Sequence, residues 1–96
     1  MAEVTWSPEA LQDLDDIAAF IARDSEYQAS AFVQRLIDAA NRLAEFPEAG
    51  RVIPELSHGR FRELIEGDYR IMYSIMGDEV RIDAVFHGVR RFGTGQ

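Results

Sequence analysis

The side chains in this sequence that could do chemistry are its arginines and its two histidines. All ten basic residues are Arg, and the chain has no Lys and no Cys. Arginine makes planar, bidentate contacts to carboxylate or phosphate, whereas lysine is the side chain whose pKa burial readily tunes for proton transfer. His87 could donate or accept a proton, because an unperturbed imidazole titrates near neutral pH. The base composition of a GC-rich genome is an alternative explanation for the exclusive use of Arg.

Other chemistries lack the residues that they need. His58 and His87 have neither the H-x-x-x-H spacing nor the Cys partners of a zinc site. The chain also has no G-x-x-x-x-G-K loop for binding phosphate. Three serines stand at or near predicted helix starts, where serine is expected as a cap: Ser7, Ser25 and Ser30. We therefore expect neither a metal nor a cofactor.

The composition predicts one small domain over residues 1–96. Hydrophobic residues make up 47% of the chain and charged residues 28%, which is typical of a folded, water-soluble protein. The N-terminus has no basic cluster of the kind that opens a signal peptide. No apolar run approaches the roughly 20 residues that cross a bilayer. These features, together with the absence of Cys, predict a cytoplasmic protein.

The charge is divided unevenly along the chain. The net charge is −7. Residues 1–49 hold three arginines and ten acids, whereas residues 50–96 hold seven of each. An acidic chain is unsuited to broad nucleic-acid binding, which depends on neutralising phosphates. The cations of the second half nevertheless could form a local binding surface.

Two helices are predicted after a short strand at 3–6. Ser7 and Pro8 start the first helix, which carries an apolar stripe of Ala10, Leu14, Ile17 and Ile21. Ser25 and Gln28 form a capping box for the second helix. Its apolar positions continue to Leu43, and Pro47 and Gly50 follow. The short connection at 23–25 predicts an antiparallel helical hairpin.

Three strands are predicted after a loop at 48–59, over 60–66, 69–76 and 79–87. A two-residue turn at Gly77-Asp78 fixes the register of the last two strands. One face then carries the apolar pairs Ile75/Val80, Tyr73/Ile82, Ile71/Ala84 and Tyr69/Phe86. The other face carries Met76/Glu79, Ser74/Arg81, Met72/Asp83 and Arg70/Val85, with His87 one step beyond. The order βααβββ predicts an α+β fold, with the helical hairpin on one face of an antiparallel sheet and the other face partly open.

Six motifs in this order resemble the RelE/ParE toxin superfamily, and in particular its ParE branch. They cover the chain from Val4 to about Arg91: W-S-P-E-A at 6–10, D-L-x-x-I at 13–17, F-P-E-A-G-R at 46–51, F-R-E-L at 61–64, D-Y-R-I-M-Y at 68–73 and V-F-H-G-V-R at 85–90. The resemblance implies a type II toxin with a ParD-like ribbon-helix-helix antitoxin, in a heterotetramer or larger hetero-oligomer. Operator DNA would be touched only through the antitoxin. No antitoxin-contact residue is assigned, although sheet edges and apolar grooves beside the helices suit such a partner.

RelE-like members of this superfamily cleave mRNA in the ribosomal A site, which requires a base, an acid and cations around the phosphate. Arg62 and Arg70 match two cationic positions of that pattern, and His87 could move a proton. At the position of the second strand cation in the RelE pattern, however, this chain has Leu64. The C-terminal segment has Phe92 in place of a tyrosine. A reduced site of Arg62, Arg70 and His87 is one alternative, and surface ion pairing with a hydrogen-bonded His87 is another.

ParE-like members poison DNA gyrase, which requires a binding surface and no proton transfer. We therefore predict a toxin that is not an enzyme, with its target-binding residues on the arginine-bearing sheet face and in the C-terminal segment: Arg62, Arg70, Arg81, His87, Arg90, Arg91 and Phe92. The acidic helical hairpin is a further candidate surface. Arg and aromatic residues are frequent interface anchors, although Arg90 and Arg91 would equally suit a frayed end. A degenerate toxin that only binds its antitoxin and regulates transcription stays open as a third hypothesis.

Overall fold

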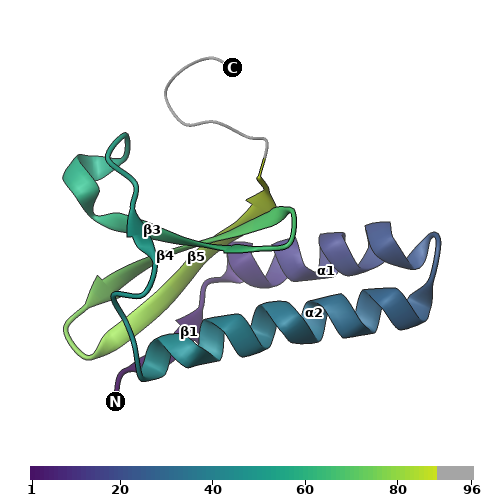
Figure 1. Cartoon of the computed structure of the whole chain (residues 1–96), viewed down its shortest axis with the longest axis horizontal. Helices are drawn as coiled ribbons and strands as arrows, with labels where there is room; N and C mark the ends of the chain where they lie inside the picture. Colours follow the sequence, from purple (N-terminus) through teal and green to yellow (C-terminus); the bar gives the residue numbers. More distant parts are fainter. Residues whose placement is uncertain (89–96) are drawn as a thin grey trace.

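The computed structural model describes residues 1–88 and has the predicted α+β architecture (Figure 1). Strand β1 (Glu3–Trp6) leads into helices α1 (Pro8–Ala22) and α2 (Glu26–Asn41). The 3-10 turn η1 (Arg42–Ala44) ends the helical region. The remaining elements are β2 (Arg51–Val52), the 3-10 turn η2 (Ser57–Gly59), β3 (Phe61–Glu66), β4 (Tyr69–Met76) and β5 (Glu79–His87). The short strand β2 lies inside the segment expected to be a loop.

Both helices begin at the predicted serines. The Ser7 hydroxyl accepts a hydrogen bond from the Ala10 amide at 3.0 Å, and the Ser25 hydroxyl accepts one from the Gln28 amide at 3.1 Å. Each bond satisfies an amide of the first helical turn that has no partner within the helix. Among residues 1–88, neither helix is long and apolar enough to span a bilayer.

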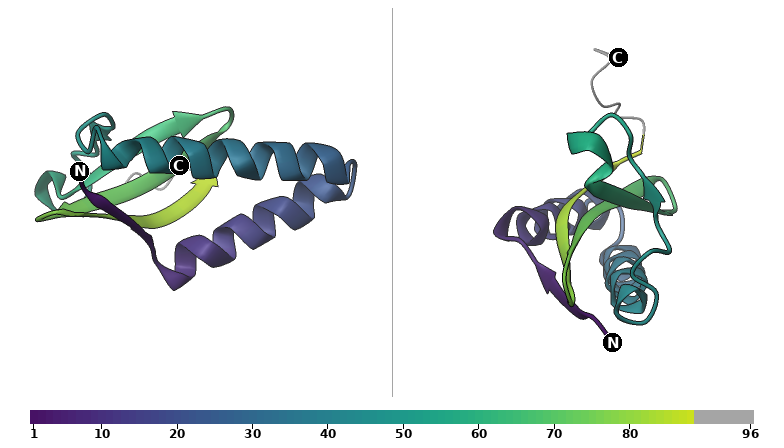
Figure 2. Two further views of the ribbon diagram at one scale, coloured as in Figure 1. Left: turned by 90° about the horizontal axis from the view of Figure 1, so that it is seen from below. Right: turned by 90° about the vertical axis from the view of Figure 1, so that its left-hand side faces the viewer.

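The sheet has five strands in the order β1-β5-β4-β3-β2. Strand β1 pairs parallel with β5, and the other neighbours pair antiparallel. The helical hairpin supplies the long connection that a parallel pair requires. Figure 2 shows α1 and α2 diverging from their connection, with the sheet lying across the opening between them. The core fills this space, and its largest fully buried side chains are Tyr73, Leu36, Leu43, Ile53, Ile71, Ile82 and Val80.

The predicted register of the β4–β5 hairpin is correct near the turn and wrong beyond it. Tyr73 pairs with Ile82 and Ser74 with Arg81, as expected. A β-bulge at Asp83 then shifts the pairing by one residue. The observed pairs are Met72/Ala84, Ile71/Val85, Arg70/Phe86 and Tyr69/His87, in place of Met72/Asp83, Ile71/Ala84, Arg70/Val85 and Tyr69/Phe86. Val85 therefore faces the helices, and Phe86 lies on the opposite face beside Arg70.

The bulge forms where α1 takes over as the neighbour of β5. The last pair between β1 and β5 is Trp6/Ile82. Beyond it, the Ser7 hydroxyl donates to the Asp83 carbonyl at 3.1 Å, and the Val85 amide donates to the Asp13 carboxylate at 2.8 Å. These side chains of the first helix satisfy backbone groups of β5 that no strand reaches.

Candidate functional site

A buried carboxylate on the open face of the sheet holds two arginines together. The Glu63 side chain is 1% exposed, and its carboxylate lies 2.6 Å from Arg51 Nε and 3.0 Å from Arg70 Nη1. Glu63 sits on β3 between the strands that carry its partners, β2 and β4. The carboxylate cancels one of the two positive charges, so this cluster keeps one net positive charge. Because a buried carboxylate is costly without partners, the position of Arg70 is set chiefly by Glu63.

Arg62 lies on the opposite face of the sheet from Arg70, contrary to the prediction of a shared face. It pairs with Tyr73, whose ring belongs to the core beneath the helices. Its Nη1 donates to the carbonyl of Gly50 at 2.8 Å and to that of Glu48 at 3.4 Å. The guanidinium of Arg62 is thus engaged with the loop that follows α2 and does not join Arg70 around a common point.

Tyr73 also forms hydrogen bonds with the loop that follows α2. Its hydroxyl donates to the carbonyl of Pro47 at 2.7 Å and accepts from the amide of Gly50 at 2.8 Å. Burial raises the pKa of Tyr73, and the Gly50 hydrogen bond partly offsets that rise. A Cβ on Gly50 would lie 2.7 Å from both the Glu63 carbonyl and the Tyr73 hydroxyl. The F-P-E-A-G-R motif therefore forms a loop whose backbone is held by hydrogen bonds from Tyr73 and Arg62.

Arg81 and Asp83 lie on the open face near the bulge. The Ser74 hydroxyl donates to Asp83 Oδ2 at 2.9 Å, and Arg81 Nε lies 3.7 Å from Asp83 Oδ1. Burial raises the pKa of Asp83, while the Ser74 hydrogen bond and the charge of Arg81 act in the opposite direction. The Arg81 side chain is 45% exposed. The Arg81 side chain is thus more exposed than that of Arg70, which is 26% exposed.

His87 lies at the far end of the sheet, on the side of the helices. The one-residue shift places it opposite Tyr69, and the two rings meet edge to face with centroids 5.4 Å apart. Tyr69 in turn contacts Phe32 of α2, also at 5.4 Å. His87 contributes to a cleft of about 400 Å³ lined by Phe20, Ile21, Phe32, Arg35, Gly67, Asp68, Tyr69 and His87.

The structure brings only part of the predicted site together. Arg70 and His87 border one small hollow of about 220 Å³, together with Ile65, Gly67, Asp68, Tyr69 and Gly88. Arg62 is elsewhere, and Arg90, Arg91 and Phe92 lie outside the described residues. Within residues 1–88, no group of three or more His, Asp or Glu side chains is placed to hold a metal ion.

Sequence reasoning missed the roles of Arg51, Glu63 and Tyr73. A signal was available for the pairing of Arg62 with Tyr73. A two-residue turn at Gly67-Asp68 sets Glu66 opposite Tyr69, and the same register then sets Arg62 opposite Tyr73. Arg62 therefore lies on the same face of the sheet as Tyr73. Arg70 lies three residues before Tyr73 on β4, and thus on the opposite face, because successive side chains of a strand alternate between faces.

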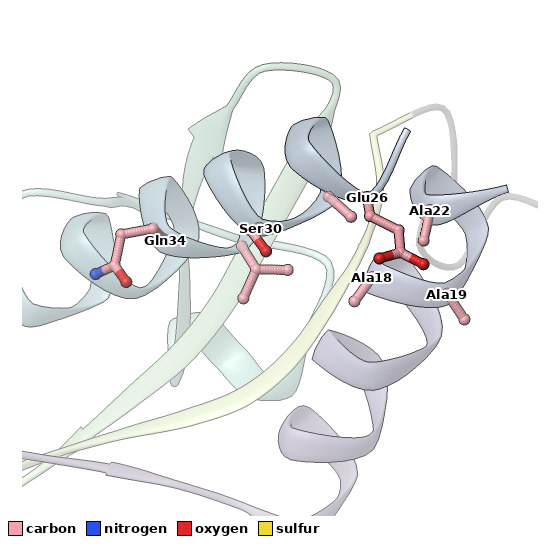
Figure 3. A pocket seen from close by; sticks show the side chains of 8 residues that line it. Ala18, Ala19, Ala22, Glu26, Ser30 and Gln34 are labelled. Carbon is pink, nitrogen blue, oxygen red and sulfur yellow. The ribbon is translucent and has the colours of Figure 1, made fainter. Parts of the chain in front are cut away.

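A second groove, of about 560 Å³, lies between the two helices (Figure 3). Figure 3 shows Ala18, Ala19 and Ala22 of α1 along one side, with Glu26, Ser30 and Gln34 of α2 along the other. Ala29 and Val33 complete the lining. The small side chains leave room for another element to approach the helix backbones closely.

Comparison with known proteins identifies the family of this chain. The model of the family described as the ParE toxin of the type II toxin-antitoxin system parDE matches residues 4–92. Toxin RelE2 of Caulobacter vibrioides is 37% identical over 91 residues, which cover 94% of this chain and 99% of that protein. Putative toxin Y4kP of Sinorhizobium fredii is 38% identical over 89 residues, which cover 88% of this chain and 85% of the relative.

Two solved structures share the fold. A chain of the chromosomal ParDE toxin-antitoxin system of P. aeruginosa superposes with a TM-score of 0.76 at 21% identity, covering 91% of this chain and 96% of that one. A chain of the toxin-antitoxin complex RelBE2 of Mycobacterium tuberculosis gives a TM-score of 0.67 at 20% identity, covering 90% and 96%. These likenesses show that the chain shares the fold of a chain in each of these two toxin-antitoxin systems. Because the ParE toxin family model matches residues 4–92, this protein belongs to the ParE toxin family.

Proposed function

We propose that this protein is the toxin of a type II toxin-antitoxin pair and that it poisons DNA gyrase in the cytoplasm by protein contacts, without acting as an enzyme. A ParD-like ribbon-helix-helix antitoxin neutralises it, in a heterotetramer or larger assembly that reaches operator DNA through the antitoxin. The toxin class follows from the family; the target and the assembly are our inference.

One observation carries the choice of mechanism: the cations of the RNase pattern do not converge. Arg62 is bound to the Gly50 carbonyl at 2.8 Å on one face of the sheet, and Arg70 is bound to Glu63 at 3.0 Å on the other. Stabilising a pentavalent phosphate needs preorganised cations aimed at one point. Leu64, at the remaining cationic position, packs against the core. This arrangement supports binding through surfaces in preference to phosphodiester cleavage.

Target contact is assigned to the exposed side of the sheet and to the C-terminal segment. Arg81 and Arg70 present guanidinium groups there, and His87 marks the end of β5. Arg90, Arg91 and Phe92 continue from that point in the sequence. The antitoxin is assigned to the groove between the helices, because small side chains accommodate a partner helix.

The test is induced expression of the chain without its antitoxin, followed by assays of purified gyrase. Gyrase poisoning predicts filamentous cells, DNA-damage signalling and loss of supercoiling activity in the presence of the toxin. Arg81→Ala should reduce the inhibition, because it removes an exposed anchor without touching the core. Unchanged supercoiling at saturating toxin, with growth arrest still present, would contradict gyrase as the target.

A second candidate is a ribosome-dependent mRNA interferase of the RelE type. The observation that favours it is the hollow shared by Arg70 and His87, the cation and the imidazole of the reduced site. On translating ribosomes this activity would produce codon-positioned cuts in mRNA that disappear with His87→Ala. The absence of cuts under conditions of growth arrest would eliminate it. A chain that causes no growth arrest at all, yet binds its antitoxin, would instead be a degenerate toxin with a regulatory role.

A further inference from the structure

An apolar groove at the turn end of the β4–β5 hairpin is distinct from the surfaces assigned above to the target and to the antitoxin. It has a volume of about 610 Å³ and is lined by the loop after α2 and by the hairpin tip. Figure 1 shows the tip of the β4–β5 hairpin at the opposite end of β5 from its C-terminal end. Its lining residues are Phe46, Pro47, Glu48, Ala49, Ile75 and Gly77. Phe46 is 60% exposed, and Met76 beside the groove is 39% exposed. Exposed apolar side chains gathered at one place mark interaction surfaces.

The backbone that directly follows Phe46 is held by the buried Tyr73 and the half-buried Arg62. Tyr73 bonds the Pro47 carbonyl and the Gly50 amide, and Arg62 bonds the Glu48 and Gly50 carbonyls. Four side-chain hydrogen bonds therefore order a loop of four residues. A surface that is already ordered loses little conformational entropy when it binds. An exposed aromatic ring on such a backbone has the properties of an interface anchor.

The charge around the groove restricts what can occupy it. Glu48 lines the groove, Glu45 precedes Phe46, and Asp78 follows Gly77; all three acids are exposed. Arg42, one turn before Phe46, and Arg62, which donates to the Glu48 carbonyl, offset two of these three charges, so the rim keeps a net negative charge. A second copy of this chain would bring the same acidic rim and a net charge of −7. The groove is therefore complementary to a segment that places an apolar side chain between arginines or lysines.

We propose that this groove, centred on Phe46, is a docking site for an apolar segment of a partner protein flanked by basic residues. The inference rests on the proposed function for its biological role, since a toxin that acts by contact needs rigid docking surfaces. It adds a surface at the opposite end of β4 from Arg70 and from Tyr69, the pairing partner of His87. Arg81 pairs with Ser74 nearer the hairpin turn, and Ser74 lies on the opposite face of β4 from the groove-lining Ile75.

The experiment is an NMR titration of the ¹⁵N-labelled chain with two short blocked peptides. Both peptides share a Leu-Phe-Leu centre, which is flanked by arginines in one and by glutamates in the other. The arginine-flanked peptide is expected to shift the amides of residues 46–49 and 75–78. The glutamate-flanked peptide should bind about tenfold more weakly, because the rim is acidic.

Phe46→Ser and Phe20→Ser form a matched pair, because the two rings are 60% and 61% exposed. Phe46→Ser should weaken the arginine-flanked peptide about tenfold, as expected when an anchor is lost. Phe20→Ser, in the His87 cleft, should leave the affinity within about twofold, as surface substitutions away from a site usually do. The amide spectrum of each variant reports whether it is folded.

Three results would overturn the proposal: no shifts at millimolar peptide, shifts confined to the His87 end, or an affinity unchanged by Phe46→Ser. Each of these results is independent of gyrase, since the titration contains only the chain and a peptide. Conversely, a failed supercoiling assay would reject gyrase as target and leave the peptide result standing. The two proposals can thus fail separately.

Discussion

Two tyrosines on the same face of β4 are held in different ways. Tyr73 is fully buried, and its hydroxyl makes two hydrogen bonds to the backbone of the loop after α2. Tyr69, four residues earlier, is half-buried and meets Phe32 and His87 through ring contacts at 5.4 Å. One end of the strand is thus fixed by directional bonds to main-chain atoms, and the other by contacts between rings at an open cleft.

This difference indicates how each end can change. Hydrogen bonds to buried backbone groups allow little displacement, because an unpaired group costs the full penalty of desolvation. Ring contacts and exposed ion pairs tolerate small shifts at a modest cost. We therefore expect substitutions at the loop end to reduce stability strongly, and substitutions at the cleft end to affect binding more than stability.

The largest effect is expected from Gly50→Ala. The new Cβ would lie 2.7 Å from the Glu63 carbonyl, which belongs to the β3 backbone and cannot rotate away. Overpacking of this kind costs about 3 kcal/mol of unfolding free energy. Urea denaturation of the purified chain measures it.

Gly77→Ala is the matched control for Gly50→Ala. Gly77 has φ +60°, and no atom lies within 4 Å of its added Cβ. Gly77→Ala should lose only about 1 kcal/mol of unfolding free energy, because alanine is strained in a left-handed backbone conformation. Equal losses in the two variants would show that Gly50 is not a close-contact position.

Tyr73→Phe should have the next largest effect. It leaves the Gly50 amide buried without its acceptor and the Pro47 carbonyl without its donor, at a cost of about 2 kcal/mol. The pKa of Tyr73 is raised by burial, so its contribution is complete below pH 10 and is lost as pH rises through the folded-state pKa. The variant should therefore lose less stability than the wild type in alkali.

Tyr27→Phe provides the comparison for Tyr73→Phe, since Tyr27 is 80% exposed. Its unfolding free energy should differ from that of the wild type by less than about 0.5 kcal/mol. If Tyr73→Phe behaves in the same way at neutral pH, the loop is not held by the hydroxyl.

The elements of this fold could be predicted from local signals, and the details of the site depended on distant contacts. Caps at Ser7 and Ser25, apolar stripes and the Gly77-Asp78 turn predicted the order of elements and the register near the turn. The bulge at Asp83 was not predictable in this way. Its causes are Ser7 and Asp13, which reach β5 from more than 70 positions away in the sequence.

In the candidate site, too, residue types could be predicted from the sequence, whereas their contacts depended on distant residues. The types of residue predicted an arginine-bearing face of the sheet, and the structure places Arg70 and Arg81 on one face. Which face each arginine occupies depends on register, and Arg62 was assigned to the wrong face. That Glu63 binds both Arg51 and Arg70 follows from the pairing of β2 with β3. The two residues of β2 were too few to indicate a strand.

Asp83→Asn tests the bulge between the two ends of β4. Because burial raises the pKa of Asp83, its contribution to stability is complete below the unfolded pKa and is lost as pH rises through the folded-state pKa. Arg81 and Arg60 oppose this shift, and Glu9 adds to it. Asparagine can still accept from Ser74 and carries no charge. The variant should therefore gain stability over the wild type as pH rises from 4 to 7. A constant difference across this range would mean that Asp83 does not titrate with an altered pKa.

The smallest effect is expected at the cleft end, from the pair Arg35 and Glu66. Arg35 Nε and Nη2 both donate to Glu66 Oε2, at 3.1 and 2.8 Å, but the arginine side chain is 57% exposed. Solvent-exposed pairs contribute about 0.5 kcal/mol. A double-mutant cycle of Arg35→Ala and Glu66→Gln should return a coupling energy of that size, which decreases as salt is added. Arg35 also stacks over Phe32 at 5.1 Å, so Arg35→Ala alone should cost more than Glu66→Gln. A coupling above about 2 kcal/mol would show instead that this end is fixed as firmly as the loop around Gly50.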